Sequence, residues 1–345
     1  MKRPPPEDLL PWGLAELGLE SPGLRVQLSV IAGDASNRRY FRLAVGSRSY
    51  ILVEAPPHTE KNAEFLAVRE LLERGGLVVP ELLGADLTRG YLLLGDLGDR
   101  LLLSELSQGS ADDCYQRAFL VLRQLGRIDT GDPAWPSYDH ALLSEELGRF
   151  PHWFAQAMLG HSWTEADERC WEPLAKRLIE SALEQPRVLV HRDFHSRNLM
   201  PQPDGSLAVI DFQDAVLGPV TYDLVSLLRD CYISWPPEQV KAWALDYHHH
   251  TQGAGELPGV SPEQFLQWFD LMGLQRHLKV LGTFARLYLR DGKQGYLDDL
   301  PQVLHYVEAM LTRYAPLMPE IENFAQWFAL ALKPLISTQP WSEAR

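Results

Sequence analysis

The chain has 345 residues, which is enough for one large or two modest domains, and 46% of them are hydrophobic. Its formal net charge of −14 argues against a nucleic-acid partner, because such a partner selects a basic face. The cysteines Cys114, Cys170 and Cys231 are scattered and form no CxxC pair, so we expect neither a structural zinc site nor a disulfide framework. Reduced, unpaired cysteines fit a cytoplasmic protein.

Neither a signal peptide nor a membrane span is expected from the hydropathy of the chain. The start, MKRPPPEDLLPWG, has two cations but no apolar core. No stretch of about 18 uninterrupted apolar residues occurs. We therefore expect no membrane partner, and a protein that works as a monomer or weak dimer.

The first third of the chain predicts a small β-rich domain with one internal helix. A short helix is expected first, then antiparallel strands on both sides of the internal helix. The expected elements are a helix over 7–19, strands over 25–32, 40–45 and 49–55, a helix over 62–74, and strands over 78–83 and 90–94.

The hairpin tip between the first two strands, GDASNRR, is rich in small and polar residues. Backbone N–H groups at such a tip permit a close approach to phosphates. The tip alone is weak evidence for nucleotide binding; in a nucleotide-binding protein, Ser36, Asn37 and Arg38 would lie nearest to the phosphates. In many kinases the strand expected here at 49–55 carries a lysine that holds the phosphates, and this strand has none. Its substitute is left open among the hairpin arginines Arg38, Arg39 and Arg42, the nearby Lys61, and a different mode of nucleotide binding.

Residues 96–100 read as a crossing between two lobes, which gives an N lobe over 1–95 and a C lobe over 101–345. Adenine would bond to the backbone of the crossing near Asp96 and Leu97. Beyond it the chain turns mainly helical. Helices are expected over 112–128, 144–159, 167–183, 221–228, 261–289, 301–314 and 320–335.

The most informative stretch lies within the C lobe, where two apolar runs, 188–190 and 207–210, flank a polar loop. His191-Arg192-Asp193 is followed by Asn198, and the second run ends in Asp211-Phe212. This order matches a protein-kinase catalytic loop and its metal-binding aspartate. A hydroxyl that attacks a γ-phosphoryl needs a carboxylate such as Asp193 to orient it and accept its proton. Mg²⁺ takes oxygen ligands, which Asn198 and Asp211 supply. We expect the turn at 201–205 to fold the second run beside the first, so that one cleft holds all three groups.

At these residues the chain resembles the aminoglycoside phosphotransferase and choline kinase-like family. It is most similar to a bacterial branch that phosphorylates the anomeric hydroxyl of N-acetylmuramate and N-acetylglucosamine. The stretches that carry the resemblance are GDASNRRYFR, VEAPP, HRDFHSRNLM, DFQDAVLGPVTYDLVSLLRD and QRHLKVLGTFARL. The resemblance implies an α+β, protein kinase-like bilobal fold with a small antiparallel N lobe and a larger helical C lobe. It also implies ATP and Mg²⁺ as cofactors.

Further residues are assigned roles around the loop. Asp223 resembles the buried aspartate of related kinases, which bonds the backbone of the catalytic loop, and His191 is also expected to be structural. His195, Asp214, Arg276 and His277 are the candidates for contact with the sugar. For Asp214 the alternative is a role in fixing its own loop, and for Arg276 it is an ion pair with a nearby carboxylate.

The sequence therefore predicts an ATP-dependent sugar kinase of peptidoglycan recycling. One rival is an aminoglycoside or amino-alcohol kinase, whose cationic acceptor would want an acidic pocket. A rival of another class is a non-catalytic nucleotide-binding scaffold, which only the missing strand lysine favours. Protein substrates are disfavoured because no extended activation segment with an APE-like end is present.

Overall fold

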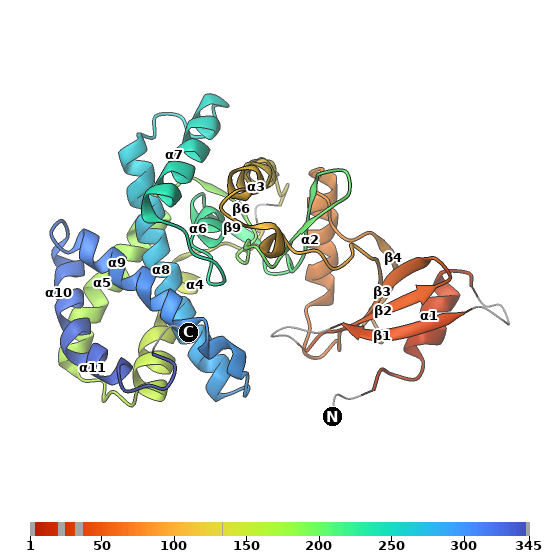
Figure 1. Ribbon diagram of the computed structural model, residues 1–345, viewed down its shortest axis with the longest axis horizontal. Coiled ribbons are helices and arrows are strands. Elements are labelled where there is room, and N and C mark those ends of the chain that lie inside the picture. The colour runs from red at the N-terminus through yellow and green to blue at the C-terminus, as the bar shows by residue number, and fades with distance from the viewer. Residues whose placement is uncertain (1–3, 20–24, 32–36, 133, 343–345) are drawn as a thin grey trace. The chain divides into compact units, whose positions relative to one another are not determined.

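The computed structural model of the chain describes residues 4–19, 25–31, 37–132 and 134–342. By its contacts the chain divides into two compact units (Figure 1). The first unit comprises Met1–Glu105 and Arg197–Asp214, and the second comprises Leu106–Ser196 and Ala215–Arg345. Within the described ranges, no helix combines the length and apolar character needed to span a bilayer.

The first unit is built on a five-stranded antiparallel sheet with the strand order β1-β2-β3-β5-β4. Two α-helices and a short β-ribbon complete it, and the expected antiparallel N-lobe sheet is confirmed. Its elements are α1 (Leu9–Glu16), β1 (Val26–Ile31), β2 (Arg39–Val45), β3 (Arg48–Glu54), α2 (Asn62–Arg74), β4 (Leu82–Asp86), β5 (Tyr91–Gly95), the 3-10 turn η1 (Leu102–Glu105), β7 (Leu199–Pro201) and β8 (Leu207–Val209).

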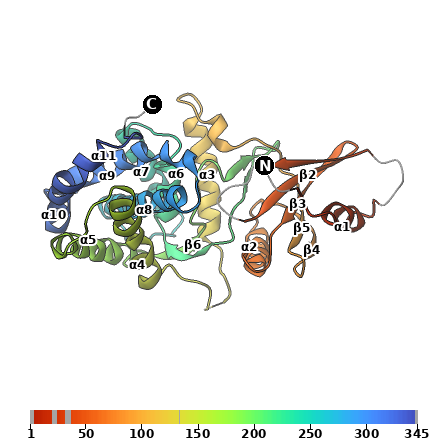
Figure 2. The ribbon, with the colours of Figure 1, turned by 90° about the horizontal axis from the view of Figure 1, so that it is seen from below.

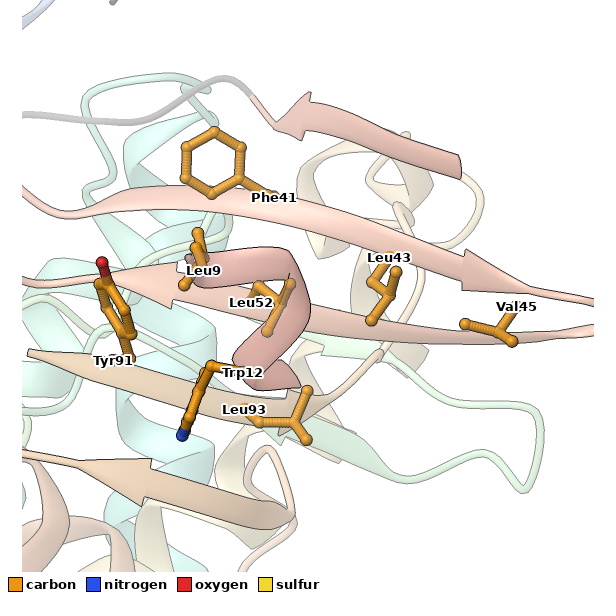
Figure 3. Close-up of a cluster of buried hydrophobic side chains, with 8 residues drawn as sticks. All are labelled: Leu9, Trp12, Phe41, Leu43, Val45, Leu52, Tyr91 and Leu93. Atoms are coloured by element: carbon orange, nitrogen blue, oxygen red, sulfur yellow. The ribbon is translucent and has the colours of Figure 1, made fainter. Parts of the chain in front are cut away.

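Helix α1 packs on one face of this sheet (Figure 3). Leu9 and Trp12 of the helix meet an apolar stripe formed by alternate residues of the strands. The stripe consists of Phe41, Leu43 and Val45 from β2, Leu52 from β3, and Tyr91 and Leu93 from β5. Every second side chain of a strand points to the same face, so the alternation in the sequence produces this stripe directly.

The bounds of the strand expected over 78–83 are wrong. β4 begins at Leu82, and Val78 forms only a lone parallel bridge with Ala208. Pro80 explains the difference, because proline has no N–H to give to a sheet ladder.

The second unit is helical and is organised around the long helix α8 (Pro262–Leu289). The residues of α8 are buried through most of its length, and α4, α5, α6, α7 and α9 pack against it. Figure 1 and Figure 2 show these helices lying around it. The unit contains α3 (Ala111–Gly126), α4 (His140–Arg149), the π-helix η2 (Phe150–Met158), α5 (Glu165–Leu183), α6 (Tyr222–Leu228), α7 (Pro237–Gly253), α8, η3 (Gln294–Leu297), α9 (Leu300–Tyr314), α10 (Pro319–Trp327), the π-helix η4 (Phe328–Leu332) and α11 (Lys333–Ile336).

The single helix expected over 144–159 is two pieces. α4 ends at Arg149 and the wider η2 turn begins at Phe150. Pro151 sits at the change, where its missing N–H removes a bond from the α-helical ladder.

The pairing expected between the two apolar runs is also wrong. β6 (Arg187–Val190) pairs with β9 (Val216–Pro219), and both lie in the second unit. The run at 207–210 supplies β8, which pairs with β7 just before it. The turn at 201–205 closes this β7–β8 hairpin: the N–H of Gly205 donates to the carbonyl of Gln202 at 3.0 Å, and Gly205 has φ +87°. The strand that pairs with the second run, β7, has three residues, which is too short to be predicted from the sequence pattern.

Candidate active site

The backbone of the predicted catalytic loop is held by the carboxylate of Asp223. The strand β6 ends at Val190, and the next two N–H groups, of His191 and Arg192, donate to Asp223 at 2.6 and 3.0 Å. Arg192 has φ +76°. A bulky side chain rarely adopts this left-handed conformation, so the surrounding contacts must hold it in place. Asp223 supplies two of them from the first turn of α6.

A second buried carboxylate, Asp230, holds the other end of the loop. It accepts from the N–H of Ser196 at 2.9 Å and from the Ser196 hydroxyl at 2.5 Å. Its other oxygen accepts from the N–H of Tyr232 at 3.0 Å. Asp223 lies in the first turn of α6 and Asp230 lies just beyond its last residue, Leu228, so this short segment fixes both ends of the loop that carries Asp193.

Asp193 lies half-buried between these two anchors. Its N–H donates to Nδ1 of His191 at 3.2 Å, and its carbonyl accepts from the N–H of His195 at 3.0 Å. Burial raises the pKa of the Asp193 carboxyl, but nearby cations outweigh it and hold that pKa below its ordinary value. The groups that lower it, in order of effect, are Lys279, His195, Arg276 and His191.

Three residues of this region were missed in the sequence: Glu146, Lys279 and Asp230. Glu146 is fully buried on α4, and its carboxylate meets Arg192 and, at 3.4 Å, the ammonium of Lys279 on α8. A signal existed, because Glu146 and Lys279 each stand at a buried position of their helices, where an apolar residue is expected.

The candidate sugar-binding residues of the second unit differ in their surroundings. The His195 ring meets the ring of Tyr232 edge-on at 5.3 Å. Arg276 is 4% exposed, and it donates a weak hydrogen bond to the sulfur of Cys231 at 3.9 Å. Burial lowers the pKa of Arg276, but Cys231, Tyr222 and Asp193 raise it by more, so the net pKa is raised and the guanidinium stays charged.

His277 is fully buried. Its Nε2 lies 3.1 Å from the carbonyl of Arg229, and its ring stacks on Tyr306 at 4.7 Å. Burial and then Arg276 lower its pKa well below the ordinary value, so the imidazole is neutral. A neutral His277 offers no cation for an anionic sugar, and its predicted contact with the sugar stays a prediction.

The two candidate metal ligands, Asn198 and Asp211, lie at one end of the β7–β8 ribbon in the first unit. Leu199 pairs with Val209, and just beyond them the N–H of Ile210 donates to the carbonyl of Asn198 at 3.1 Å. Asp211 follows directly with φ +62°. Among the described residues other than glycine, Arg192 and Asp211 are the two with positive φ. Such strain concentrates at functional positions.

Asp211 is held in place through its neighbours. Phe212 is fully buried and stacks on Phe65 of α2 with ring centroids 5.0 Å apart. The side-chain amide of Gln213 donates to Asp211 at 2.9 Å. Across the described part of the chain, no cluster of three or more His, Cys, Asp or Glu side chains could hold a metal alone. One amide and one carboxylate suit a magnesium ion that takes its remaining oxygens from phosphates and water.

The hairpin tip is described in part. Ser36 lies outside the described residues, whereas the N–H of Asn37 donates to Glu60 at 3.0 Å. Arg38 is 3% exposed, donates to the carbonyl of Lys61 at 3.2 Å, and lies over the ring of Phe65 at 4.8 Å.

The proposed substitutes for the strand lysine differ in what they already bind. Arg38 pairs with Glu60 at 3.3 Å, and Arg39 pairs with Glu54, the residue directly opposite it on β3. That pairing gives the buried Glu54 a partner. The side chain of Lys61 is 66% exposed and makes one loose ion pair, with Asp214 at 3.6 Å. Lys61 is therefore the candidate most available to an incoming anion.

The side chain of Asp96 ties the predicted crossing to strand β2 and to its own turn. Asp96 accepts from Arg42 at 2.7 and 3.1 Å and from the N–H of Gly98 at 2.9 Å. Burial raises the pKa of Asp96, but these bonds outweigh it and lower the pKa overall. With its side chain engaged, Asp96 offers a ligand its backbone alone, and so does the half-buried, apolar Leu97.

Comparison with known proteins supplies the family. Residues 27–260 match the model of the "Phosphotransferase enzyme family". The chain is 42% identical to an N-acetylmuramate/N-acetylglucosamine kinase of Pseudomonas putida over 302 residues, covering 88% of this chain and 87% of the relative. It is 38% identical to the kinase of the same name from Neisseria meningitidis, covering 85% of this chain and 88% of the relative.

Solved structures agree on the fold at low sequence identity. A choline kinase from Streptococcus pneumoniae matches with a TM-score of 0.61 and 15% identity, covering 88% of this chain and 99% of that one. An ADP-bound aminoglycoside phosphotransferase matches with a TM-score of 0.56 and 15% identity, covering 86% of this chain and 98% of that one. The kinase-like fold expected from the sequence is confirmed, and the chain belongs to the phosphotransferase enzyme family.

Proposed function

We propose that this protein transfers the γ-phosphoryl group of ATP to the anomeric hydroxyl of N-acetylmuramate and N-acetylglucosamine, in the recycling of peptidoglycan sugars. The observation that carries the proposal is the 42% identity, over 88% of the chain, with kinases named for these two sugars. The sugar 1-phosphate would be the product.

Each candidate residue has a role in this reaction. Asp193 orients the sugar hydroxyl and accepts its proton. Asn198 and Asp211 would hold Mg²⁺, which when bound supplies positive charge to neutralise the phosphates. Positioning and charge neutralisation supply most of the rate in such a transfer. A hemiacetal hydroxyl is more acidic than an ordinary alcohol, which suits a base whose pKa is held low.

The nucleotide would be bound by the first unit. The tip residues Ser36, Asn37 and Arg38 would lie nearest to its phosphates, and the backbone of Asp96 and Leu97 nearest to adenine. Lys61 takes the place of the strand lysine in this proposal. Its support is the exposed ammonium with one loose partner.

Four residues are candidates for recognising the acceptor. Arg276 is the candidate for the carboxylate of N-acetylmuramate, because it is a buried cation that, among the described residues, donates a weak hydrogen bond to the thiol of Cys231. His195, Asp214 and His277 remain candidates for the hydroxyls or for ordering Arg276. A cationic aminoglycoside or choline acceptor fits less well, since the strongest electrostatic partners of Asp193 are cations.

One assay tests the proposal. The protein is incubated with Mg·ATP and a panel of N-acetylmuramate, N-acetylglucosamine, an aminoglycoside and choline, and ADP release is followed. The expected result is release with the two sugars, with an anomeric phosphate identified by phosphorus NMR. Release with choline or the aminoglycoside alone would contradict the sugar assignment, and no release with any acceptor would favour a binding scaffold. Asp193→Ala should abolish the sugar-dependent release.

A further inference from the structure

A buried group of charges in the second unit surrounds the loop that carries Asp193. Glu146, on α4, is fully buried and accepts from the guanidinium of Arg192 and from the hydroxyl of Tyr138. The ammonium of Lys279, on α8, lies 3.4 Å from the same carboxylate. It also donates to the hydroxyl of Tyr222 at 2.9 Å. Glu146 therefore joins a residue of the catalytic loop to a helix some 80 positions away in the chain.

Aromatic side chains pack around these charges and limit their contact with water. The rings of Tyr138 and Tyr222 meet edge-on at 5.0 Å, and both residues are buried. Arg192 lies over the ring of Tyr138 at 5.7 Å, and the amide of Gln275 donates to the hydroxyl of Tyr138 at 3.3 Å. In so enclosed a place an unbalanced charge is costly.

The charges of this group do not balance without Asp193. Arg192 and Lys279 carry one positive charge each, and Glu146 carries one negative charge. Asp193, directly after Arg192, brings the second negative charge. Lys279 is also the cation with the largest effect on the Asp193 carboxyl, and its own pKa is raised by Glu146 and Asp193 against the effect of burial.

We propose that Lys279, held by Glu146 and Tyr222, is a positioning residue that keeps Asp193 ionised and fixes the loop through the quartet Glu146, Arg192, Asp193 and Lys279. The inference rests on the proposed function for its kinetic test, because Asp193 is the base of that reaction. Lys279 acts through Asp193 and Arg192, and it needs no contact with the sugar or the nucleotide.

The quartet makes opposite predictions for its two outer members. Lys279→Met leaves the group one charge too negative, so the Asp193 carboxyl gains a proton more easily. Glu146→Gln leaves it one charge too positive, so Asp193 loses its proton more easily. The double variant restores the net charge of the quartet, and the protonation of Asp193 should return towards that of the wild type. A merely structural role predicts no such reversal of sign.

The test is the pH dependence of kcat/KM for N-acetylglucosamine at saturating Mg·ATP. The acid limb should move up by about one pH unit in Lys279→Met, consistent with the loss of one close opposite charge. In Glu146→Gln the acid limb should stay at the wild-type pH or move to lower pH, and in the double variant it should return towards the wild-type pH. Lys279→Arg should keep the wild-type profile. Other groups also face Asp193 or its partners, and they are common to all the variants. They are His191, His195, Tyr138, Tyr222, Asp223 and Arg276.

The matched control is Lys176→Met on α5, where the lysine is 76% exposed and lies 3.9 Å from Glu180. It should leave the profile unchanged. If Lys279→Met loses activity by one factor at every pH, or shifts in the same direction as Glu146→Gln, the proposal is overturned. A wild type without sugar-dependent turnover would instead contradict the proposed function.

A second readout needs no activity. Urea unfolding midpoints are compared for Asp193→Asn, Lys279→Met and the variant carrying both changes. If Asp193 and Lys279 balance each other, the midpoint of the double variant should fall by less than the sum of the two single shifts. Additive shifts would overturn the proposal, whatever the activity of the protein.

Discussion

Asp223 accepts a 3.0 Å hydrogen bond from the backbone N–H of Arg192, the residue that precedes Asp193 and has φ +76°. Replacing Asp223 with alanine leaves that N–H and the N–H of His191 without their acceptor in a buried place. The loop backbone should then relax towards negative φ and displace Asp193. A small displacement of a reacting group costs about a hundredfold in rate. We expect kcat in Asp223→Ala to fall by about this factor.

The control for this prediction is Asp223→Asn, which keeps one carbonyl oxygen as an acceptor at the same place. Its kcat should lie between those of the wild type and the alanine variant. Equal losses in the two variants would show that the charge of Asp223 matters rather than its hydrogen bonds.

Asp223 also predicts a pH dependence of stability. Burial raises the pKa of its carboxyl from 3.8 to about 7, although the two N–H bonds act in the opposite direction. The folded state therefore holds this proton more tightly than the unfolded chain does. The stabilising contribution is fully present below pH 3.8 and is lost as the pH rises through about 7.

Urea unfolding at several pH values measures this effect. The free energy of unfolding of the wild type, relative to Asp223→Asn, should fall by up to about 4 kcal/mol between acid pH and pH 8. Other carboxyls shift the absolute curve, so the difference between the two proteins is the quantity to compare. A constant difference across this range would mean that Asp223 has an ordinary pKa.

The order of motifs along the chain was predictable from the sequence because each motif is local. The spacing of His191, Asp193 and Asn198 lies within one loop, and the apolar pattern of α8 gave that helix nearly residue for residue. The pairing of β6 with β9 was not predictable in this way, because it joins two short strands across 25 intervening residues. The roles of Glu146 and Lys279 could not be predicted from local pattern either, because each buried charge is balanced by a partner on another helix.

The Asn198 and Asp211 pair predicts a strong effect of Asp211→Asn on turnover. The substitution keeps the size of the side chain but removes the charge that would attract Mg²⁺. Sugar-dependent ADP release should fall on the order of a thousandfold, and the concentration of Mg²⁺ needed for half activity should rise. Asp204→Asn lies in the exposed turn of the same ribbon, where Asp204 accepts hydrogen bonds from Ser206, and it should change neither value. Equal effects of the two substitutions would contradict the metal role of Asp211.

Lys61 predicts an effect on nucleotide affinity. Lys61→Met removes an exposed ammonium on the first unit, and KM for ATP should rise by about tenfold, the effect of one charge-assisted bond. The KM for the sugar should change little. Arg74→Met removes another exposed cation from the same unit and should leave both values alone. An unchanged KM for ATP in Lys61→Met would contradict this role of Lys61 and would mean that another group replaces the missing lysine.

Arg276 predicts a difference between the two sugars. N-acetylmuramate carries a carboxylate that N-acetylglucosamine lacks, and the buried Arg276 donates a weak hydrogen bond to the thiol of Cys231. Arg276→Met should raise KM for N-acetylmuramate by about tenfold or more, because a charge-assisted hydrogen bond is lost. It should raise KM for N-acetylglucosamine much less. Arg169→Met, which removes an arginine that is 72% exposed on α5, controls for the change in net charge. If Arg276→Met raises KM for both sugars equally, Arg276 orders the site around Asp193 rather than recognising the carboxylate.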